Sequence, residues 1–227
     1  MINIHPRNDS ISQETLDAYR AVASGTLGHL LDTAMEGSIA ALWKPGKLVG
    51  PALTVQTVPG SYLAVAKACD VAKPGDVLVV SRAGELRHAA TGEFGSVQAM
   101  EAGIAGMVAD GPITDRAAIE RIGFPVFSTG SVAQVTKPHG LEEGAVNVPV
   151  QVGGITVNPG DLILADDDGV IVATPKEALE CLLDCQAAEA WEAYAREQLS
   201  SGRKMFDFRG ERPGFVEAFL AKAQRGG

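Results

Sequence analysis

The sequence is poor in positive charge and in aromatic residues. Its 227 residues carry 28 acidic and 19 basic side chains, which leaves a formal net charge of −9 at pH 7. A chain of this sign lacks the basic field that attracts nucleic-acid phosphates or an anionic membrane surface. Aromatic residues make up only 5% of the chain, so a platform on which bases stack is not expected either. We therefore expect a protein that binds neither nucleic acid nor membranes.

Cysteines and long apolar runs are scarce as well. Cys69, Cys181 and Cys185 are too few and too irregularly spaced for a disulfide framework. Cys181 and Cys185 lie four residues apart on a predicted helix, but no histidine or further cysteine completes a redox or metal site, so we expect buried or half-buried free thiols. No apolar run approaches the roughly 20 residues that cross a bilayer, and the first residues lack the apolar stretch of a signal peptide. We therefore expect a cytoplasmic protein.

Several common catalytic and nucleotide-binding motifs are absent. The chain contains no GxxxxGK[ST], GxGxxG, HExxH, GxSxG or CxxC. Without a glycine-rich loop after a strand, a Rossmann-type dinucleotide enzyme or methyltransferase is not expected. The 46% of hydrophobic residues and 21% of charged residues are ordinary for a folded domain. The 26 glycines indicate tight turns and close backbone contacts, as in small-molecule enzymes.

The middle of the chain alternates short strands and helices. Apolar patterns predict strands at residues 47–58, 76–81, 106–109 and 125–127, and helices at residues 62–71, 92–102 and 115–121. Two further short helices are predicted near the N-terminus, around residues 16–22 and 27–31. Alternation at such short intervals is typical of parallel β/α units, so we predict an α/β fold.

The pattern changes after Gly130. Short strands are predicted at residues 148–152, 155–157, 162–165 and 170–173, separated by glycine-, proline- and aspartate-rich turns. Such turns between short apolar runs indicate antiparallel hairpins. A long helix is predicted at residues 176–199 and a last amphipathic segment at residues 215–223. We divide the chain into a main domain, residues 1–201, and a C-terminal helical tail, residues 202–227, which we expect to dock on a neighbouring subunit.

Three consecutive carboxylates, Asp166, Asp167 and Asp168, precede Gly169. Carboxylate oxygens are good ligands for a cation. Asp-Gly between two apolar strands is also the usual composition of a hairpin turn, in which successive side chains point in different directions. We favour the turn.

A candidate metal ligand lies in the segment 105–116. A predicted strand ends there at Asp110-Gly111, and a loop leads to a helix that begins near Asp115. Loops after the carboxyl ends of parallel strands are where α/β proteins place ligands, and an aspartate there can bind a divalent ion directly or through water. The alternative is that Thr114 or Asp115 caps the helix. The residues alone leave both interpretations open.

A second candidate feature begins at Thr91, where another loop leads into a helix. Gly92 and Gly95 allow the backbone to approach a ligand, and free N–H groups at a helix start suit a carboxylate or phosphate. Glu93 is either an acid/base group or outer metal partner, or a first-turn residue favoured by the helix dipole. An anion cradle and a metal ligand are thus predicted on neighbouring loops.

These segments, taken in order, resemble the RraA-like family. The resemblance is carried by Pro74-Gly75-Asp76 with its following apolar run, by Gly92-Glu93-Phe94-Gly95, by residues 103–111 with Asp115, and by residues 125–127, 157–161 and 166–170. It spans roughly residues 24–189. The family includes the regulator of ribonuclease E activity and divalent-metal-dependent 4-hydroxy-4-methyl-2-oxoglutarate aldolases.

The resemblance implies a swivelling β/β/α domain with helical N- and C-terminal extensions, assembled as a homotrimer or homohexamer with the site between subunits. It implies that Asp115 binds Mg or Mn and that the backbone around Gly92, Glu93, Phe94 and Gly95 binds the carboxylate of a small 2-oxoacid. It also places Glu93 at the family's first acidic position. By this resemblance, Glu93 and Asp115 are the predicted catalytic residues.

The family pattern has an arginine directly before the metal-binding aspartate, where this chain has Thr114. Threonine cannot supply a bidentate cation to an enolate, and Arg82, Arg87 and Arg116 are the candidates to reach in from another backbone position. We predict a divalent-metal-dependent lyase that cleaves or decarboxylates a small 2-oxoacid and releases pyruvate or a related oxoacid, with Thr114 among the substrate-binding residues. The alternative is a non-catalytic binding protein that regulates a partner such as a ribonuclease through its acidic surface.

Overall fold

The computed structural model describes the chain except residues 8–10, 45, 59, 137–142 and 212–227. The predicted segment at residues 215–223 therefore lies outside the described residues. The helices are α1 (Gln13–Tyr19), α2 (Ser24–Gly28), α3 (Leu63–Cys69), α4 (Glu93–Glu101), α5 (Arg116–Ile122), α6 (Pro175–Ser200) and α7 (Met205–Phe208). The strands are β1 (Ile2–Ile4), β2 (Ala40–Ala41), β3 (Leu48–Thr57), β4 (Val77–Ser81), β5 (Gly106–Ala109), β6 (Val126–Ser128), β7 (Gly144–Val146), β8 (Val150–Val152), β9 (Ile155–Val157), β10 (Leu162–Asp166) and β11 (Gly169–Ala173).

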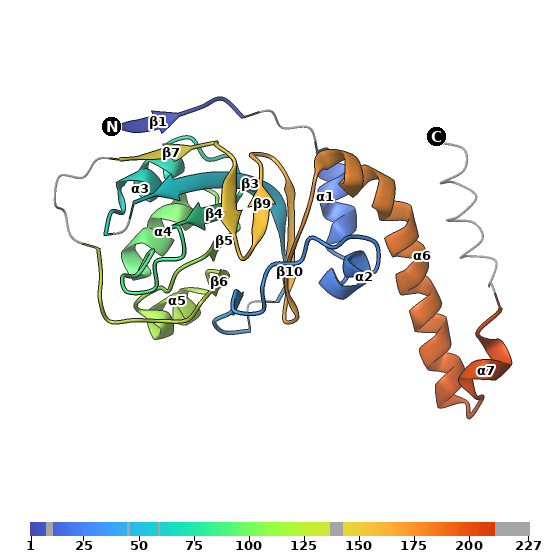
Figure 1. Ribbon diagram of the computed structural model, residues 1–227. Coiled ribbons are helices and arrows are strands. Elements are labelled where there is room, and N and C mark those ends of the chain that lie inside the picture. The colour runs from blue at the N-terminus through green and yellow to red at the C-terminus, as the bar shows by residue number, and fades with distance from the viewer. Residues whose placement is uncertain (8–10, 45, 59, 137–142, 212–227) are drawn as a thin grey trace.

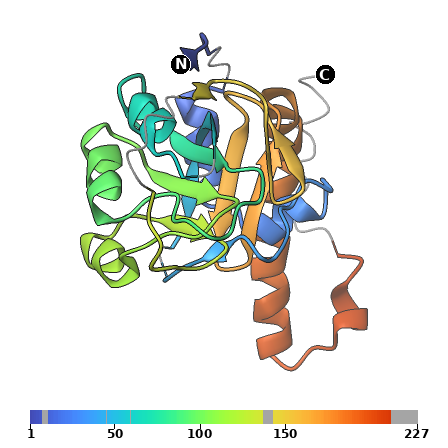
Figure 2. The same cartoon turned by 60° about the vertical axis from the view of Figure 1, so that its left-hand side comes forward.

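Four parallel strands form the centre of the main sheet (Figure 1). β4 pairs with β3 on one side and β5 on the other, and β6 follows β5. β4 and β5 are buried along their whole length, and all their residues except Ser81 at the end of β4 are non-polar, because both faces of the sheet are covered. Helices α3, α4 and α5 cover one face (Figure 2), where Leu78, Val80 and Met107 contribute to a first core. The predicted α/β fold with parallel β/α units is confirmed.

Two antiparallel hairpins follow in the chain. β8 pairs with β9, and β10 pairs with β11. The first residues of β3 also pair with β10, whereas its later residues pair with β4, so β3 is shared between both parts of the sheet. Val77, Val79 and Val108 point away from α3–α5 and pack with hairpin residues such as Val152 and Ile163 in a second core. The predicted hairpins are confirmed.

The aspartate-rich segment is a hairpin turn, as predicted. Asp166, the last residue of β10, pairs with Gly169, the first residue of β11. Its carboxylate accepts hydrogen bonds from the backbone N–H and hydroxyl of Ser24 and lies 3.3 Å from the Lys47 ammonium. Burial raises the pKa of Asp166, but these bonds and the Lys47 charge outweigh burial and hold the pKa below its usual range. The side chain therefore ties the turn to the start of α2. Within the described residues, no group of three or more His, Cys, Asp or Glu side chains is arranged to hold a metal ion.

The sequence patterns do not predict three short strands, β1, β2 and β7. Each has only two or three residues. β1 pairs with β7 from a distant part of the chain, and β7 also pairs with the end of β3. Segments this short show no periodicity of their own, so the partner strand, and not the local sequence, determines that they are strands.

The cysteines are free thiols. Cys69 and Cys185 are buried and Cys181 is half-buried, as predicted. Burial raises the pKa of the Cys185 thiol to about 12, so this group stays protonated and unreactive near neutral pH. No helix among the described residues is long and apolar enough to span a membrane.

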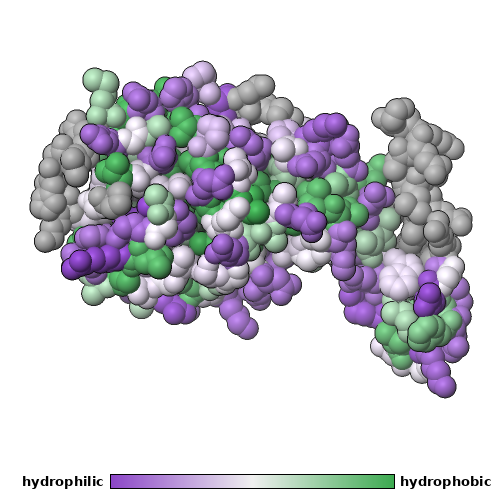
Figure 3. All heavy atoms as spheres, in the orientation of Figure 1, coloured by the Kyte–Doolittle hydropathy of each residue, from purple (hydrophilic) through white to green (hydrophobic). Residues whose placement is uncertain are grey.

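Helix α6 extends from the body of the molecule as an arm (Figure 1). Its first part packs against β10 and β11 in a third core, to which Ala178 and Cys185 contribute. Further along, Tyr194 contacts Phe208 of α7 edge to face, with ring centroids 6.2 Å apart. Hydrophobic residues gather at the tip of the arm (Figure 3), where Phe206 is 80% exposed.

The boundary between a main domain and a tail at residues 201 and 202 stays a prediction.

Thr174→Ala should lower the free energy of unfolding by about 1 kcal/mol. Thr174 caps α6 by accepting the N–H of Glu177, whose carboxylate accepts the backbone N–H and the hydroxyl of Thr174 at 2.8 and 2.7 Å. These hydrogen bonds lower the pKa of Glu177, so its stabilising effect is present above the pKa of the unfolded state and is lost as the pH falls. In chemical denaturation, Thr174→Ala should therefore lower the free energy of unfolding less at a pH well below the usual glutamate pKa than near neutral pH. Lys176→Ala, an exposed change in the same turn, is the control, and an equal loss in both variants would contradict the capping role.

Candidate functional site

Two loops at the carboxyl ends of β4 and β5 border a small pocket. One loop leads from β4 to α4 and the other from β5 to α5. The pocket has a volume of about 220 Å³, and its lining consists of Tyr62, Ala89, Thr91, Gly92, Phe94, Gly95, Thr114, Asp115, Val135 and Thr136. It lies where α/β folds usually bind ligands. The fold thus brings together Gly92, Phe94, Gly95, Thr114 and Asp115, which the sequence places on separate loops.

Asp115 does not cap its own helix. It directly precedes α5 with φ of 56° and ψ of 33°, and its side chain makes no hydrogen bond to the first turn of α5. The Oδ2 atom instead accepts the N–H of Glu93, at the start of α4, at 3.1 Å, and the Thr114 hydroxyl lies 3.4 Å from Oδ1. The interpretation of Asp115 as a cap for the helix that it precedes is therefore wrong. Its carboxylate connects the two loops.

The donor set at Asp115 fits a divalent ion that keeps part of its water shell. The Asp115 side chain is exposed, and a carboxylate has about four lone-pair sites, of which these two bonds use only two. Mg²⁺ is commonly held by one or two carboxylates, with water or a substrate completing its coordination. The carboxylate of Glu93 lies outside the pocket lining and pairs with Arg121 at 3.0 Å. Glu93 therefore contributes its backbone N–H, and not its carboxylate, to the arrangement around Asp115.

The start of α4 forms the part of the pocket wall beside the Asp115 carboxylate, which accepts the N–H of Glu93. Within the described part of the chain, the N–H groups of Phe94 and Gly95 have no hydrogen-bond acceptor. A side chain at Gly95 would begin 2.6 Å from the Tyr62 hydroxyl and would also collide with the Thr91 hydroxyl, so glycine keeps this wall open. Two free amides at the positive end of a helix suit a carboxylate. Anion binding by these amides stays a prediction.

No cationic side chain is among the described residues that line this pocket. Arg82 is fully buried, and its Nη2 lies 2.7 Å from Glu85 Oε2. Arg87 and Arg116 are exposed and lie outside the lining. None of these three arginines therefore supplies the positive charge that the family arginine would provide at the position of Thr114.

Sequence reasoning missed Tyr62, Val135 and Thr136 as parts of the pocket. Burial raises the pKa of Tyr62 to about 12, so its hydroxyl stays protonated, and it donates a hydrogen bond to Gln98 Oε1 at 3.0 Å. Tyr62 directly precedes α3, and Val135 and Thr136 follow β6, so tertiary packing alone brings them to the cradle. No local motif marks any of them.

Comparisons with known proteins identify the family. The family model RraA-like, described as Aldolase/RraA, matches residues 16–172. A relative from Halalkalibacterium halodurans, provisionally named a 4-hydroxy-4-methyl-2-oxoglutarate aldolase, is 37% identical over 200 residues, which cover 86% of this chain and 94% of the relative. The crystal structure of an uncharacterized protein from Pseudomonas syringae superposes with a TM-score of 0.78 at 29% identity, covering 90% of this chain and 96% of that one. RraAS2 from Streptomyces coelicolor, described as an unusual member of the RNase ES inhibitor RraA protein family, superposes with a TM-score of 0.73 at 29% identity, covering 83% and 99%.

Proposed function

The chain belongs to the RraA-like family, and we propose that it is a divalent-metal-dependent lyase acting on a small 2-oxoacid. The single observation that carries the proposal is that the exposed Asp115 carboxylate and the free N–H groups of Phe94 and Gly95 belong to residues lining the same pocket of about 220 Å³. A carboxylate that can hold a metal and amides that can hold an anion are the two groups that binding of a 2-oxoacid requires. The relative named as an aldolase supports the same class of reaction.

In the proposed site, Asp115 holds Mg²⁺ or Mn²⁺ and Thr114 lies beside it. When bound, the metal supplies a Lewis acid that stabilises negative charge on the 2-oxo oxygen. The N–H groups of Phe94 and Gly95 bind and orient the substrate carboxylate. The backbone N–H of Glu93 positions Asp115, while a catalytic role for the Glu93 carboxylate stays a prediction.

The proposal is tested by incubating the protein with Mg²⁺ or Mn²⁺ and either oxaloacetate or 4-hydroxy-2-oxoacids, with pyruvate measured by a coupled dehydrogenase. We expect pyruvate above a metal-only blank, and we expect a chelator to abolish its release. If no pyruvate forms and oxalate with Mg²⁺ does not stabilise the protein against heat, the lyase proposal fails. The chain would then be a binding protein of the kind that regulates a partner such as a ribonuclease.

We also propose that the chain assembles as a homotrimer or homohexamer through contacts that include its C-terminal tail. The exposed apolar tip of the arm, with Leu199 and Phe206 at 46% and 80% exposure, supports a docking role. Truncation after Leu199 should therefore give a smaller assembly than the full chain in multi-angle light scattering. The same assembly mass for both proteins, with unchanged thermal unfolding, would contradict this role. The predicted cytoplasmic location also stays a proposal.

A further inference from the structure

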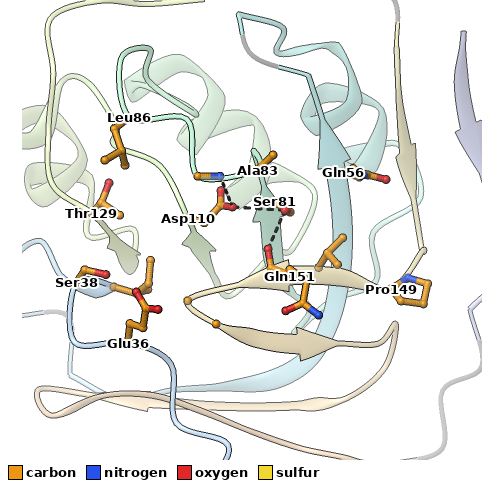
Figure 4. Close-up of a pocket in the computed structure, with 15 residues that line it drawn as sticks. Glu36, Ser38, Gln56, Ser81, Ala83, Leu86, Asp110, Thr129, Pro149 and Gln151 are labelled. Atoms are coloured by element: carbon orange, nitrogen blue, oxygen red, sulfur yellow. Dashed lines mark hydrogen bonds between the residues drawn. The ribbon is translucent and has the colours of Figure 1, made fainter.

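A second, larger cavity lies between the ends of the central strands and the hairpin β8–β9 (Figure 4). Its volume is about 720 Å³, within the range of small-molecule sites. Ser81 and Asp110 reach it from the ends of β4 and β5, and Thr129 reaches it from the residue after β6. The cavity therefore occupies the carboxyl ends of three neighbouring parallel strands, where α/β folds bind ligands.

The wall of this cavity is acidic. Glu36 and Asp110 both lie on it (Figure 4), and no Lys, Arg or His is among the described residues that line it. Asp110 is only 9% exposed, and its carboxylate accepts the N–H groups of Arg82 and Gly84 at 2.6 and 3.1 Å. Among the ion pairs of the described residues, none includes Asp110 or Glu36. The two N–H groups and the Ser81 hydroxyl, 3.4 Å from Asp110 Oδ2, satisfy part of the Asp110 carboxylate but do not neutralise its charge, so the wall would attract a cation in the cavity.

Two further features are found at residues that line the cavity. The Thr129 hydroxyl oxygen is buried and has no hydrogen-bond partner in the described part of the chain, and such unsatisfied groups are rare in folded proteins. Ala83, on the same wall, has φ of 55°. A non-glycine residue in this left-handed region is strained, and such strain concentrates at functional sites.

The apolar part of the lining indicates that the ligand has an apolar part as well. Ile39, Leu86 and Val150 border the cavity beside the acidic groups. They provide contact area for an aliphatic chain, while the carboxylates provide acceptors for a charged end. A 2-oxoacid anion does not fit this wall because it would meet two like charges.

We propose that this cavity binds a small molecule with a primary ammonium group on a short aliphatic chain. The ammonium group donates hydrogen bonds to Asp110 or Glu36, and the chain packs on the apolar side chains. This site is separate from the Asp115 pocket and takes a ligand of the opposite charge.

Isothermal titration calorimetry on the full chain with putrescine tests the proposal. Butane-1,4-diol is the matched neutral probe, and succinate is the matched anion. We expect putrescine to bind at least about tenfold more tightly than the diol, because its ammonium groups meet the carboxylates, and we expect no binding of succinate to this cavity. Binding of the diol as tight as that of putrescine, or no binding of putrescine, would overturn the proposal.

Variants then locate the site. Glu36→Gln, an exposed isosteric change, and Asp110→Asn should each weaken putrescine binding by about tenfold. Glu101→Gln, which removes an exposed carboxylate from the end of α4, is the control for the general acidity of the surface. Asp115→Asn should bind putrescine as the unmodified protein does, which separates this site from the proposed lyase site. Equal weakening in Glu36→Gln and Glu101→Gln would mean that putrescine binds only to the acidic surface, and the proposal would fail.

Discussion

Replacing Asp115 with asparagine should reduce metal-dependent pyruvate release by about a thousandfold. The amide has the shape of the carboxylate but carries no charge, so it binds a divalent ion poorly. Asparagine also tolerates the left-handed backbone at this position, where φ is 56°. Its carbonyl oxygen can still accept the N–H of Glu93, so the loop should keep its structure. Activity and thermal unfolding, measured on the same preparation, separate loss of the metal from loss of the fold.

The control for this variant is Asp167→Asn in the turn between β10 and β11. Asp167 is an exposed carboxylate outside both pockets, so its replacement removes the same charge without removing a metal ligand. We expect nearly full activity. If Asp115→Asn kept as much activity as Asp167→Asn, then Asp115 would not be the metal ligand.

Gly92→Ala should lower activity by about a hundredfold and the free energy of unfolding by about 1–3 kcal/mol. The new Cβ atom would lie 2.5 Å from Asp115 Oδ2 and 2.7 Å from Thr114 Cγ2, so it would displace the carboxylate from its present position. Gly92 has an extended backbone that any residue can adopt, which makes crowding, and not backbone strain, the cause of the loss. Enzyme assays combined with calorimetric measurement of Mg²⁺ binding would show both effects.

Gly37→Ala provides the matched control. A Cβ atom at Gly37 meets no atom within 4 Å, so neither activity nor stability should change beyond about 0.5 kcal/mol. Gly92→Ala with unchanged Mg²⁺ affinity would show that the position of the Asp115 carboxylate does not control metal binding.

The fold was predictable where local chemistry determines structure. The hairpin turns consist of Gly153-Gly154 and Asp167-Asp168, whose residue types are common in such turns. The buried strands β4 and β5 are apolar runs because both faces are covered. The sharing of β3 between β4 and β10 was not predictable, because the sequence of a strand does not identify its partners.

The site was predictable only in part. Gly92 and Asp115 belong to segments with recognisable loop chemistry, and the sequence places both after parallel strands. The pairing of the Glu93 carboxylate with Arg121, at the surface, was not visible from sequence. It depends on how α4 and α5 lie beside each other, which no spacing in the sequence encodes. Tyr62 illustrates the same limit, since only packing brings its hydroxyl to the cradle.

The loop that follows β4 forms part of both pockets. Ala83, Gly84 and Leu86 line the larger cavity, and Ala89, Thr91 and Gly92 line the pocket at Asp115. The Asp110 carboxylate anchors the start of this loop through the N–H groups of Arg82 and Gly84. A ligand that moves the loop from one side changes the affinity on the other side, and thermodynamic linkage makes the two effects equal in size. If the two proposed ligands bind, the shared loop is the segment through which the occupancy of one pocket could change the affinity of the other.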